Sequence, residues 1–253
     1  MRKYLSLLLA ASLVACSKET PKEVEVTFNL GVQSGPMTRA GNEGVYEALS
    51  ITAPPAPFYL DARSTEDNSL SYSMVTGEPL TMTVGEYEVW GSGYGNTIEK
   101  ANNGTLYYTP SWEADEIVNV SVDATEYTVR ANFKCFALVF DRSEVARVEL
   151  FVPSRGCVDL RMNGSDDYWV LYATPDEGFE WSSSNSLHLY VHPVDELHYQ
   201  MRAFYIGNVT GGQSHDDYVN ATFGYWYKLS PCEVTETSGA MWISFPEWQE
   251  GSF

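Results

Sequence analysis

The chain has 253 residues, a formal net charge of −19 and a hydrophobic content of 44%. This apolar content is enough to build folded cores, which excludes a disordered chain. So negative a surface repels both the phosphate backbone of nucleic acids and anionic lipid headgroups. We therefore expect no nucleic-acid partner.

The first fifteen residues have the layout of a secretory signal peptide. Arg2 and Lys3 form a basic start, an apolar core runs to Val14, and the small residue Ala15 follows. The apolar run is about half of the roughly 20 residues that a membrane-spanning helix needs. We therefore predict that residues 1–15 are a signal peptide that is removed and not a membrane anchor.

The four residues that end this leader, Leu13-Val14-Ala15-Cys16, resemble a bacterial lipobox, in which a lipid is attached to the cysteine sulfur. The motif lies directly after the basic and apolar segments of a secretory leader, where a lipobox is expected. We predict that Cys16 is lipidated and that residues 16–23 form a short polar tether. The alternative is that Cys16 is an ordinary thiol near a conventional cleavage site.

From Val24 onward the chain is typical of a series of short strands. Between Val24 and Val32 every second residue is apolar, the pattern of a half-buried strand. Further strands are expected at 45–52, 58–62, 70–75, 80–84, 87–92, 106–109, 117–122, 127–133, 137–140, 145–152, 168–173, 187–192, 199–206, 223–229 and 241–245. Turn-forming residues separate most of these segments, and no stretch has a long helical period.

This pattern predicts an all-β protein with little helix. Many short strands with frequent turns are typical of antiparallel sandwiches. The length allows one large domain or two of ordinary size. We predict two antiparallel Greek-key β-sandwich domains in tandem, at 24–125 and 126–253.

A resemblance to a known family rests on several features together. The lipobox, the tether and the alternating strand are followed by Thr38-Arg39-Ala40 in a loop rich in glycine. This arrangement resembles the fimbrillin-like lipoproteins of Bacteroidales. The segment from Leu80 to Trp90, LTMTVGEYEVW, is similar to that group's recurrent strand, turn and strand.

The resemblance implies two transthyretin-like sandwiches and a surface-exposed protein anchored to the outer membrane by its lipid. It also implies that stalk subunits are cut by a protease after an arginine. In this sequence the cut falls between Arg39 and Ala40. If Arg39 is an ordinary loop cation, the chain stays intact; anchor and tip relatives need not be cut.

The first strand is the segment that such a cut would release. Each large apolar residue that it buries contributes about 1.5–3 kcal/mol, and the sum is comparable with the ~5–15 kcal/mol that keeps a domain folded. Its loss leaves a groove that a strand of another fimbrial subunit can fill by β-augmentation. The apolar residues of this candidate strand are Val24, Val26, Phe28, Leu30 and Val32.

The titratable residues form no recognisable catalytic or metal motif. His188 and His192 lie four residues apart in an expected strand, so about 13 Å separates them and they cannot share one metal ion. The acidic pairs Asp166-Asp167 and Asp216-Asp217 lack the ligand spacing of an EF-hand. Nucleophile-elbow, zinc-protease, P-loop and dinucleotide-binding motifs are absent from the sequence. We expect no enzyme activity, no cofactor and no metal.

Three cysteines follow Cys16, namely Cys135, Cys157 and Cys232. In an oxidising compartment one pair can form a disulfide and leave one thiol over. The sequence does not determine which two of these cysteines form the disulfide.

Two functions fit this sequence. One is a lipid-anchored structural or adhesive fimbrial subunit, or the anchor of such a subunit. The other is a surface glycan-binding lipoprotein whose exposed aromatic residues stack on sugar rings. The tryptophans considered for that role are Trp112, Trp169, Trp181, Trp226 and Trp248.

Overall fold

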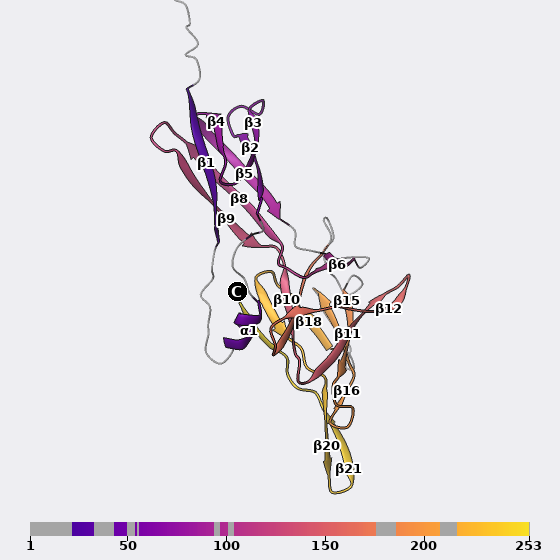
Figure 1. The fold of residues 1–253 in the computed structure, drawn as a ribbon. Helices are drawn as coiled ribbons and strands as arrows, with labels where there is room; N and C mark the ends of the chain where they lie inside the picture. Colours follow the sequence, from indigo (N-terminus) through magenta and orange to yellow (C-terminus); the bar gives the residue numbers. More distant parts are fainter. Residues whose placement is uncertain are drawn as a thin grey trace, which may run out of the picture.

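The computed structural model describes residues 22–32, 43–49, 54, 56–93, 97–100, 104–175, 186–207 and 217–252. These residues form an elongated molecule of two lobes, one above the other in Figure 1. Strands make up nearly all of the regular structure, and α1 (Glu43–Leu49) is the one helix of the described part. The prediction of an all-β fold is confirmed.

The first lobe is a single sheet of seven strands in the order β3-β2-β5-β8-β9-β1-β4. These strands are β1 (Glu23–Val32), β2 (Tyr59–Ser64), β3 (Ser71–Val75), β4 (Pro79–Thr83), β5 (Gly85–Gly93), β8 (Trp112–Val120) and β9 (Glu126–Phe133). The two edge strands of this sheet, β3 and β4, contact each other. The Tyr72 hydroxyl on β3 donates to Thr83 Oγ1 (3.2 Å) on β4 and accepts from the Thr83 amide (3.1 Å). The sheet therefore curls around its own core.

Alternation along the strands builds that core. In β2, for example, Leu60, Ala62 and Ser64 are buried and the residues between them are exposed. The largest buried side chains of the first lobe are Phe28, Phe58, Tyr87 and Trp112. A strand that faces water on one side and the core on the other produces this period of two.

The second lobe is a sandwich of two larger sheets with a small third sheet beyond them. One sheet has the order β22-β19-β10-β14-β7-β6, with β13 also paired to β14, and the other has the order β12-β11-β15-β17-β18. The first comprises β6 (Thr97–Lys100), β7 (Gly104–Tyr107), β10 (Phe136–Asp141), β13 (Asn163–Gly164), β14 (Tyr168–Pro175), β19 (Tyr225–Lys228) and β22 (Gln249–Ser252). The second comprises β11 (Val145–Val152), β12 (Gly156–Asp159), β15 (Leu187–Pro193), β17 (Arg202–Gly207) and β18 (Asp217–Asn220). The third comprises β16 (Tyr199–Gln200), β20 (Cys232–Thr237) and β21 (Ala240–Ser244).

Strand β10 lies at the centre of the second lobe and is buried on both faces. Phe136, Leu138 and Phe140 point into the core between the two larger sheets. Ala137 and Val139 point to the opposite face, which α1 covers. A strand covered on both sides is continuously apolar, which explains the run Phe-Ala-Leu-Val-Phe.

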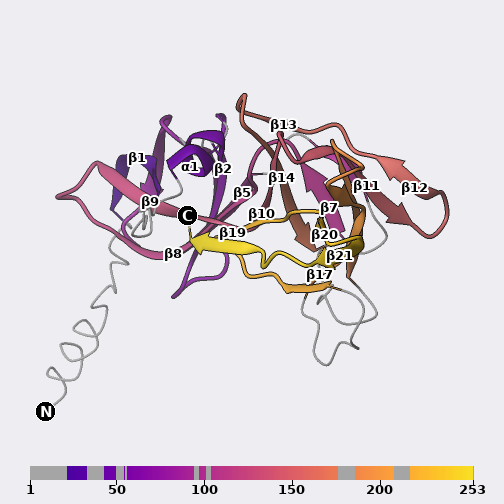
Figure 2. The same ribbon diagram turned by 90° about the horizontal axis from the view of Figure 1, so that it is seen from below.

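The expected strand at 45–52 is wrong for the residues that the structure describes, because residues 43–49 form α1. Val45, Ala48 and Leu49 are spaced as one face of a helix, and all three are buried against the first sheet of the second lobe. The Tyr46 hydroxyl donates to the Ser252 carbonyl of β22 (3.1 Å), and in Figures 1 and 2 the C-terminus lies beside α1.

The chain passes between the lobes more than once. Strands β6 and β7 follow β5 in the sequence but pair within the second lobe, whereas β9 pairs with β8 and β1 in the first. The division at residues 24–125 and 126–253 stays a prediction. The sheets are also mixed, since β1 with β9, β10 with β19 and β17 with β18 are parallel pairs.

Candidate functional site

The first strand, β1, lies inside the sheet of the first lobe and not at its edge. Residues 23–27 run antiparallel to residues 79–83 of β4, and residues 27–32 run parallel to residues 126–131 of β9. The Phe28 carbonyl also accepts a hydrogen bond from the Gly77 amide (2.8 Å). Both edges of β1 are therefore engaged by other strands.

The side chains of β1 contribute to the core unevenly. Val26 and Phe28 are 0% and 1% exposed, and the Phe28 ring stacks on Tyr127 with a centroid distance of 5.5 Å. Val24 and Leu30 pack against the same core and are partly buried, whereas Val32 is 36% exposed. The side chains of Val26 and Phe28 thus fill the core of the first lobe, whereas Val32, at the end of the strand, lies outside it.

Three predicted site residues, Cys16, Arg39 and Ala40, lie outside the described residues. The described chain on either side of Arg39 belongs to different lobes, because β1 ends at Val32 in the first lobe and α1 begins at Glu43 on the second. No helix in the described part of the chain has the length and apolar character to cross a bilayer.

The hairpin formed by β20 and β21 projects from the end of the second lobe (Figure 1). Every residue of β21 is exposed, and among the described residues this strand pairs only with β20. The exposed fractions of Met241, Trp242, Ile243 and Phe245 are 68%, 63%, 47% and 62%. An unpaired edge with large apolar side chains on both faces is a template for association with another chain.

Arg202 holds the segment that follows the hairpin against the second lobe. Its side chain is 5% exposed, pairs with the Asp217 carboxylate, and donates to the carbonyls of Pro246 (2.8 Å) and Ser230 (3.4 Å). The guanidinium carbon also lies 5.4 Å from the centre of the Phe245 ring. The base of the hairpin is therefore fixed while its tip is exposed.

The histidines lie apart, as their spacing in the sequence predicts. His188 and His192 are both on β15; His188 stacks on Tyr205 (4.1 Å between centroids), and His192 Nε2 lies 2.7 Å from Glu149 Oε2. Among the described residues, no three His, Cys, Asp or Glu side chains gather where they would hold a metal ion. His215 and Asp216 lie outside the described residues.

The three cysteines Cys135, Cys157 and Cys232 form no disulfide. Cys135 is fully buried, and this burial raises the pKa of its thiol to about 12. Cys157 is exposed on β12. The buried Cys135 thiol therefore stays protonated and unreactive at neutral pH.

Two of the tryptophans proposed as sugar platforms are core residues. Trp112 and Trp226 are 1% and 0% exposed, so neither presents a ring face to a ligand. Trp169 and Trp248 are partly buried and pack against the core of the second lobe. Trp181 lies outside the described residues. The prediction of exposed aromatic rings was wrong for Trp112 and Trp226, because Trp112 fills the core of the first lobe and Trp226 is buried in the layer beneath α1.

Comparison with known proteins gives distant structural neighbours. No protein-family model matches the sequence, and no curated protein matches it. The structure is similar to the tip fimbrial protein Mfa3 from Porphyromonas gingivalis, with 9% identity, a TM-score of 0.46, and coverage of 92% of this chain and 100% of that one. It is also similar to a fimbrial assembly protein from Parabacteroides distasonis, with 8% identity, a TM-score of 0.42, and coverage of 92% and 97%. Both neighbours are fimbrial proteins.

Proposed function

We propose that this chain is a structural or adhesive fimbrial subunit, or the anchor of one, held on the outer membrane by a lipid on Cys16. In this proposal an uncut chain keeps the lipid and serves as an anchor or tip, whereas a chain cut after Arg39 loses the lipidated segment together with β1 and assembles by strand exchange at the position of β1. The observation that carries it is the placement of β1 between β4 and β9.

The acceptor in this exchange is the groove that β1 occupies. If the chain is cut between Arg39 and Ala40, β1 is no longer covalently joined to the rest of the protein. Its departure exposes the hydrogen-bonding edges of β4 and β9 and the hydrophobic core that Val26 and Phe28 cover. A groove of this kind binds an incoming strand through main-chain hydrogen bonds and alternate side-chain pockets.

The donor in this exchange is the C-terminal hairpin of another subunit. Met241, Ile243 and Phe245 form an alternating apolar row, which we call the hairpin row, and all three are exposed. The hairpin row repeats the spacing with which β1 presents Val26 and Phe28 to the core. Because side chains at alternate positions of a strand share one face, the hairpin row can fill the pockets that β1 leaves. Pairing with both β4 and β9 requires that β21 separates from β20 and that Phe245 leaves Arg202.

The first test is the state of the N-terminus in cells. Mass and N-terminal sequence distinguish an acylated Cys16, expected of an anchor or tip subunit, from an N-terminal Ala40, expected of an assembled stalk subunit. Cys16→Ala is expected to abolish incorporation of labelled fatty acid and to release the protein from the membrane fraction. An unchanged membrane partition of Cys16→Ala would overturn lipid anchoring.

The second test concerns strand exchange. If Ala40 is found, Ile243→Asp is expected to abolish the ladder of multimers seen on a partly denaturing gel, since a carboxylate cannot enter an apolar pocket. The matched control is Ile117→Asp, which changes an isoleucine that is 60% exposed on β8 of the first lobe. Equal ladders from both variants, or equal loss in both, would contradict the role of the hairpin row.

A further inference from the structure

Among the described residues, strand β4 has one neighbour in the sheet of the first lobe, and that neighbour is β1. Residues 79–83 of β4 pair with residues 23–27 of β1, whereas β9 pairs with residues 27–32. The two walls of the groove are therefore staggered, and a strand that replaces β1 has to pair with β4 over its first half. If β1 leaves, β4 keeps no strand partner, and an isolated strand is not stable in water.

Two phenols hold the end of β4 independently of β1. The Tyr72 hydroxyl on β3 bonds to both Oγ1 and the amide of Thr83 (3.2 Å and 3.1 Å). The Tyr87 hydroxyl on β5 donates to the Thr83 carbonyl (2.8 Å). Both main-chain groups of Thr83 are thus bonded to side chains of other strands. We call Tyr72, Tyr87 and Thr83 the β4 clasp.

The rings of the β4 clasp belong to the core of the first lobe. Tyr87 is 1% exposed, and Tyr72 is partly buried against the same core. The two rings pack edge to face, with 5.7 Å between their centres. Burial raises the pKa of Tyr87 to about 12, so its hydroxyl remains a donor at neutral pH. Both hydroxyls are therefore carried by rings that pack against each other, on strands that do not pair with β1.

The middle and the start of β4 have contacts of their own. Met82 is 0% exposed and lies in the core of the first lobe. In the turn before β4, the Thr76 amide donates to the Phe58 carbonyl (3.0 Å), and the Glu78 amide donates to the Val75 carbonyl (3.2 Å). These hydrogen bonds do not involve β1. The strand is thus held at both ends by groups that remain when β1 is gone.

We infer that the β4 clasp keeps the acceptor groove open after β1 has left, which makes Tyr72 and Tyr87 positioning residues for strand acceptance. This inference rests on the proposed strand exchange. An incoming strand that meets β4 already in place does not have to order a wall of the groove, and such preorganisation lowers the Kd. Without the clasp, the five residues of β4 have to be ordered each time a strand binds.

The test uses the chain from Cys16 onward with a site for a sequence-specific protease inserted after Arg39. After cutting, a dilution series followed by native mass spectrometry gives the Kd of the β1 fragment. Exchange of the fragment for an excess of a synthetic peptide of residues 22–33 gives its dissociation rate constant. Tyr72→Phe and Tyr87→Phe are each expected to raise the Kd about tenfold, which corresponds to ~1.4 kcal/mol. The dissociation rate constant is expected to stay nearly unchanged, because the clasp acts on the empty groove.

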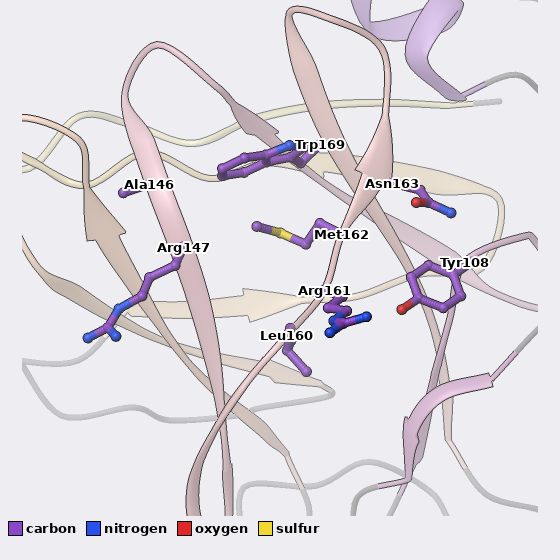
Figure 3. Close-up of a pocket in the computed structure, with 8 residues that line it drawn as sticks. All are labelled: Tyr108, Ala146, Arg147, Leu160, Arg161, Met162, Asn163 and Trp169. Atoms are coloured by element: carbon purple, nitrogen blue, oxygen red, sulfur yellow. The ribbon is translucent and has the colours of Figure 1, made fainter.

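Two tyrosines of the second lobe supply the controls. The Tyr227 hydroxyl accepts from the Thr222 amide (2.9 Å) and donates to the Asn220 carbonyl (3.1 Å), so Tyr227→Phe loses comparable hydrogen bonds. Tyr108 lines a cavity of about 600 Å³, shown in Figure 3, and Tyr108→Phe tests the same substitution at the surface of the other lobe. Both controls are expected to leave the Kd unchanged.

Thermal unfolding of the uncut proteins shows which variants fold. A tyrosine variant that does not fold is replaced by Thr83→Val, which removes the Oγ1 acceptor and is expected to raise the Kd by a smaller factor. If the β1 fragment of the unsubstituted protein neither dissociates nor exchanges, strand exchange and this inference both fail. If it exchanges but the clasp variants leave the Kd unchanged, the inference alone fails. Equal effects of the controls, or a change confined to dissociation, would also overturn it.

Discussion

Gly91 lies on β5 directly against the backbone of β2. A Cβ atom at this position would lie 2.3 Å from the Tyr59 carbonyl oxygen and 2.9 Å from Leu60 Cδ2. Because the first neighbour is backbone, the strand has to move to relieve the overlap. We expect Gly91→Ala to lower the free energy of unfolding by about 1–3 kcal/mol or more. Urea unfolding checks this value, with Ser92→Ala at an exposed neighbouring position as the control; equal midpoints would contradict the expectation.

Arg202 gives a second prediction at the scale of single residues. Its buried guanidinium pairs with Asp217, so Arg202→Met leaves that carboxylate without its cation. We expect a loss of about 3–5 kcal/mol in the free energy of unfolding. The double variant Arg202→Met with Asp217→Asn removes both charges and is expected to recover much of the loss. If the double variant is less stable than Arg202→Met, the account of an unpaired charge is wrong.

Asp141 gives a pH dependence whose direction follows from its contacts. Burial acts to raise the pKa of the Asp141 carboxyl, but hydrogen bonds from Ser143 (2.6 Å and 3.0 Å) and the ion pair with Lys228 (3.2 Å) outweigh it and lower the pKa below 3.8. A carboxyl whose pKa is lowered by folding stabilises the protein above its unfolded pKa, and this contribution is lost as the pH falls through the folded pKa.

Asp141→Asn is therefore expected to cost about 1–2 kcal/mol of unfolding free energy at pH 7. The difference from the unsubstituted protein should shrink as the pH falls from 3.8 downward. Urea titrations at several pH values measure this. A difference that stays constant down to pH 2 would show that Asp141 acts through its shape and not its charge.

At the scale of secondary-structure elements, α1 shows where sequence patterns mislead. The run from Val45 to Thr52 is short and contains β-branched residues, which favour a strand when the segment is considered alone. The structure makes residues 43–49 a helix because the face of Val45, Ala48 and Leu49 covers β10 and Trp226. The partner that decides between helix and strand lies about 90 residues or more further along the chain, so no local pattern reveals it.

Two substitutions in α1 test how much this contact contributes. Leu49 is 2% exposed, so Leu49→Ala is expected to lower the free energy of unfolding by about 2–5 kcal/mol. Tyr46→Phe removes only the hydrogen bond to the Ser252 carbonyl and is expected to cost about 0.5–1.5 kcal/mol. Thermal unfolding of the two variants gives the comparison. A larger effect of Tyr46→Phe would mean that the helix is held by its hydrogen bond more than by its apolar face.

Strands with alternating or continuous apolar residues were the predictable elements. The expected segments at 24–32, 70–75 and 145–152 correspond closely to β1, β3 and β11. Strands β12, β13 and β22 were not expected, because they are short and polar and depend on a neighbouring strand for their hydrogen bonds. The two partner strands of β1 were also beyond prediction, since β4 and β9 come from separated segments that only the fold brings together.

At the scale of the whole molecule, the two lobes differ in their dependence on the N-terminal segment. A chain that begins at Ala40 lacks β1 but keeps α1, so the second lobe retains its described contacts while the first loses a central strand. Amide hydrogen exchange is expected to show lost protection in β4 and β9 and retained protection in β10, β14 and β15. Equal loss in both lobes would show that the lobes fold as one cooperative unit.

The hydrogen bond between Tyr46 and Ser252 joins residues from opposite ends of the described chain. A polypeptide is synthesised from its amino end, and Ser252 is made 206 residues after Tyr46. The layer that packs over Trp226 is consequently finished only after β22 has been synthesised. The second lobe of every copy thus remains incomplete until that point, and a product that stops before β22 lacks the strand that pairs with β19.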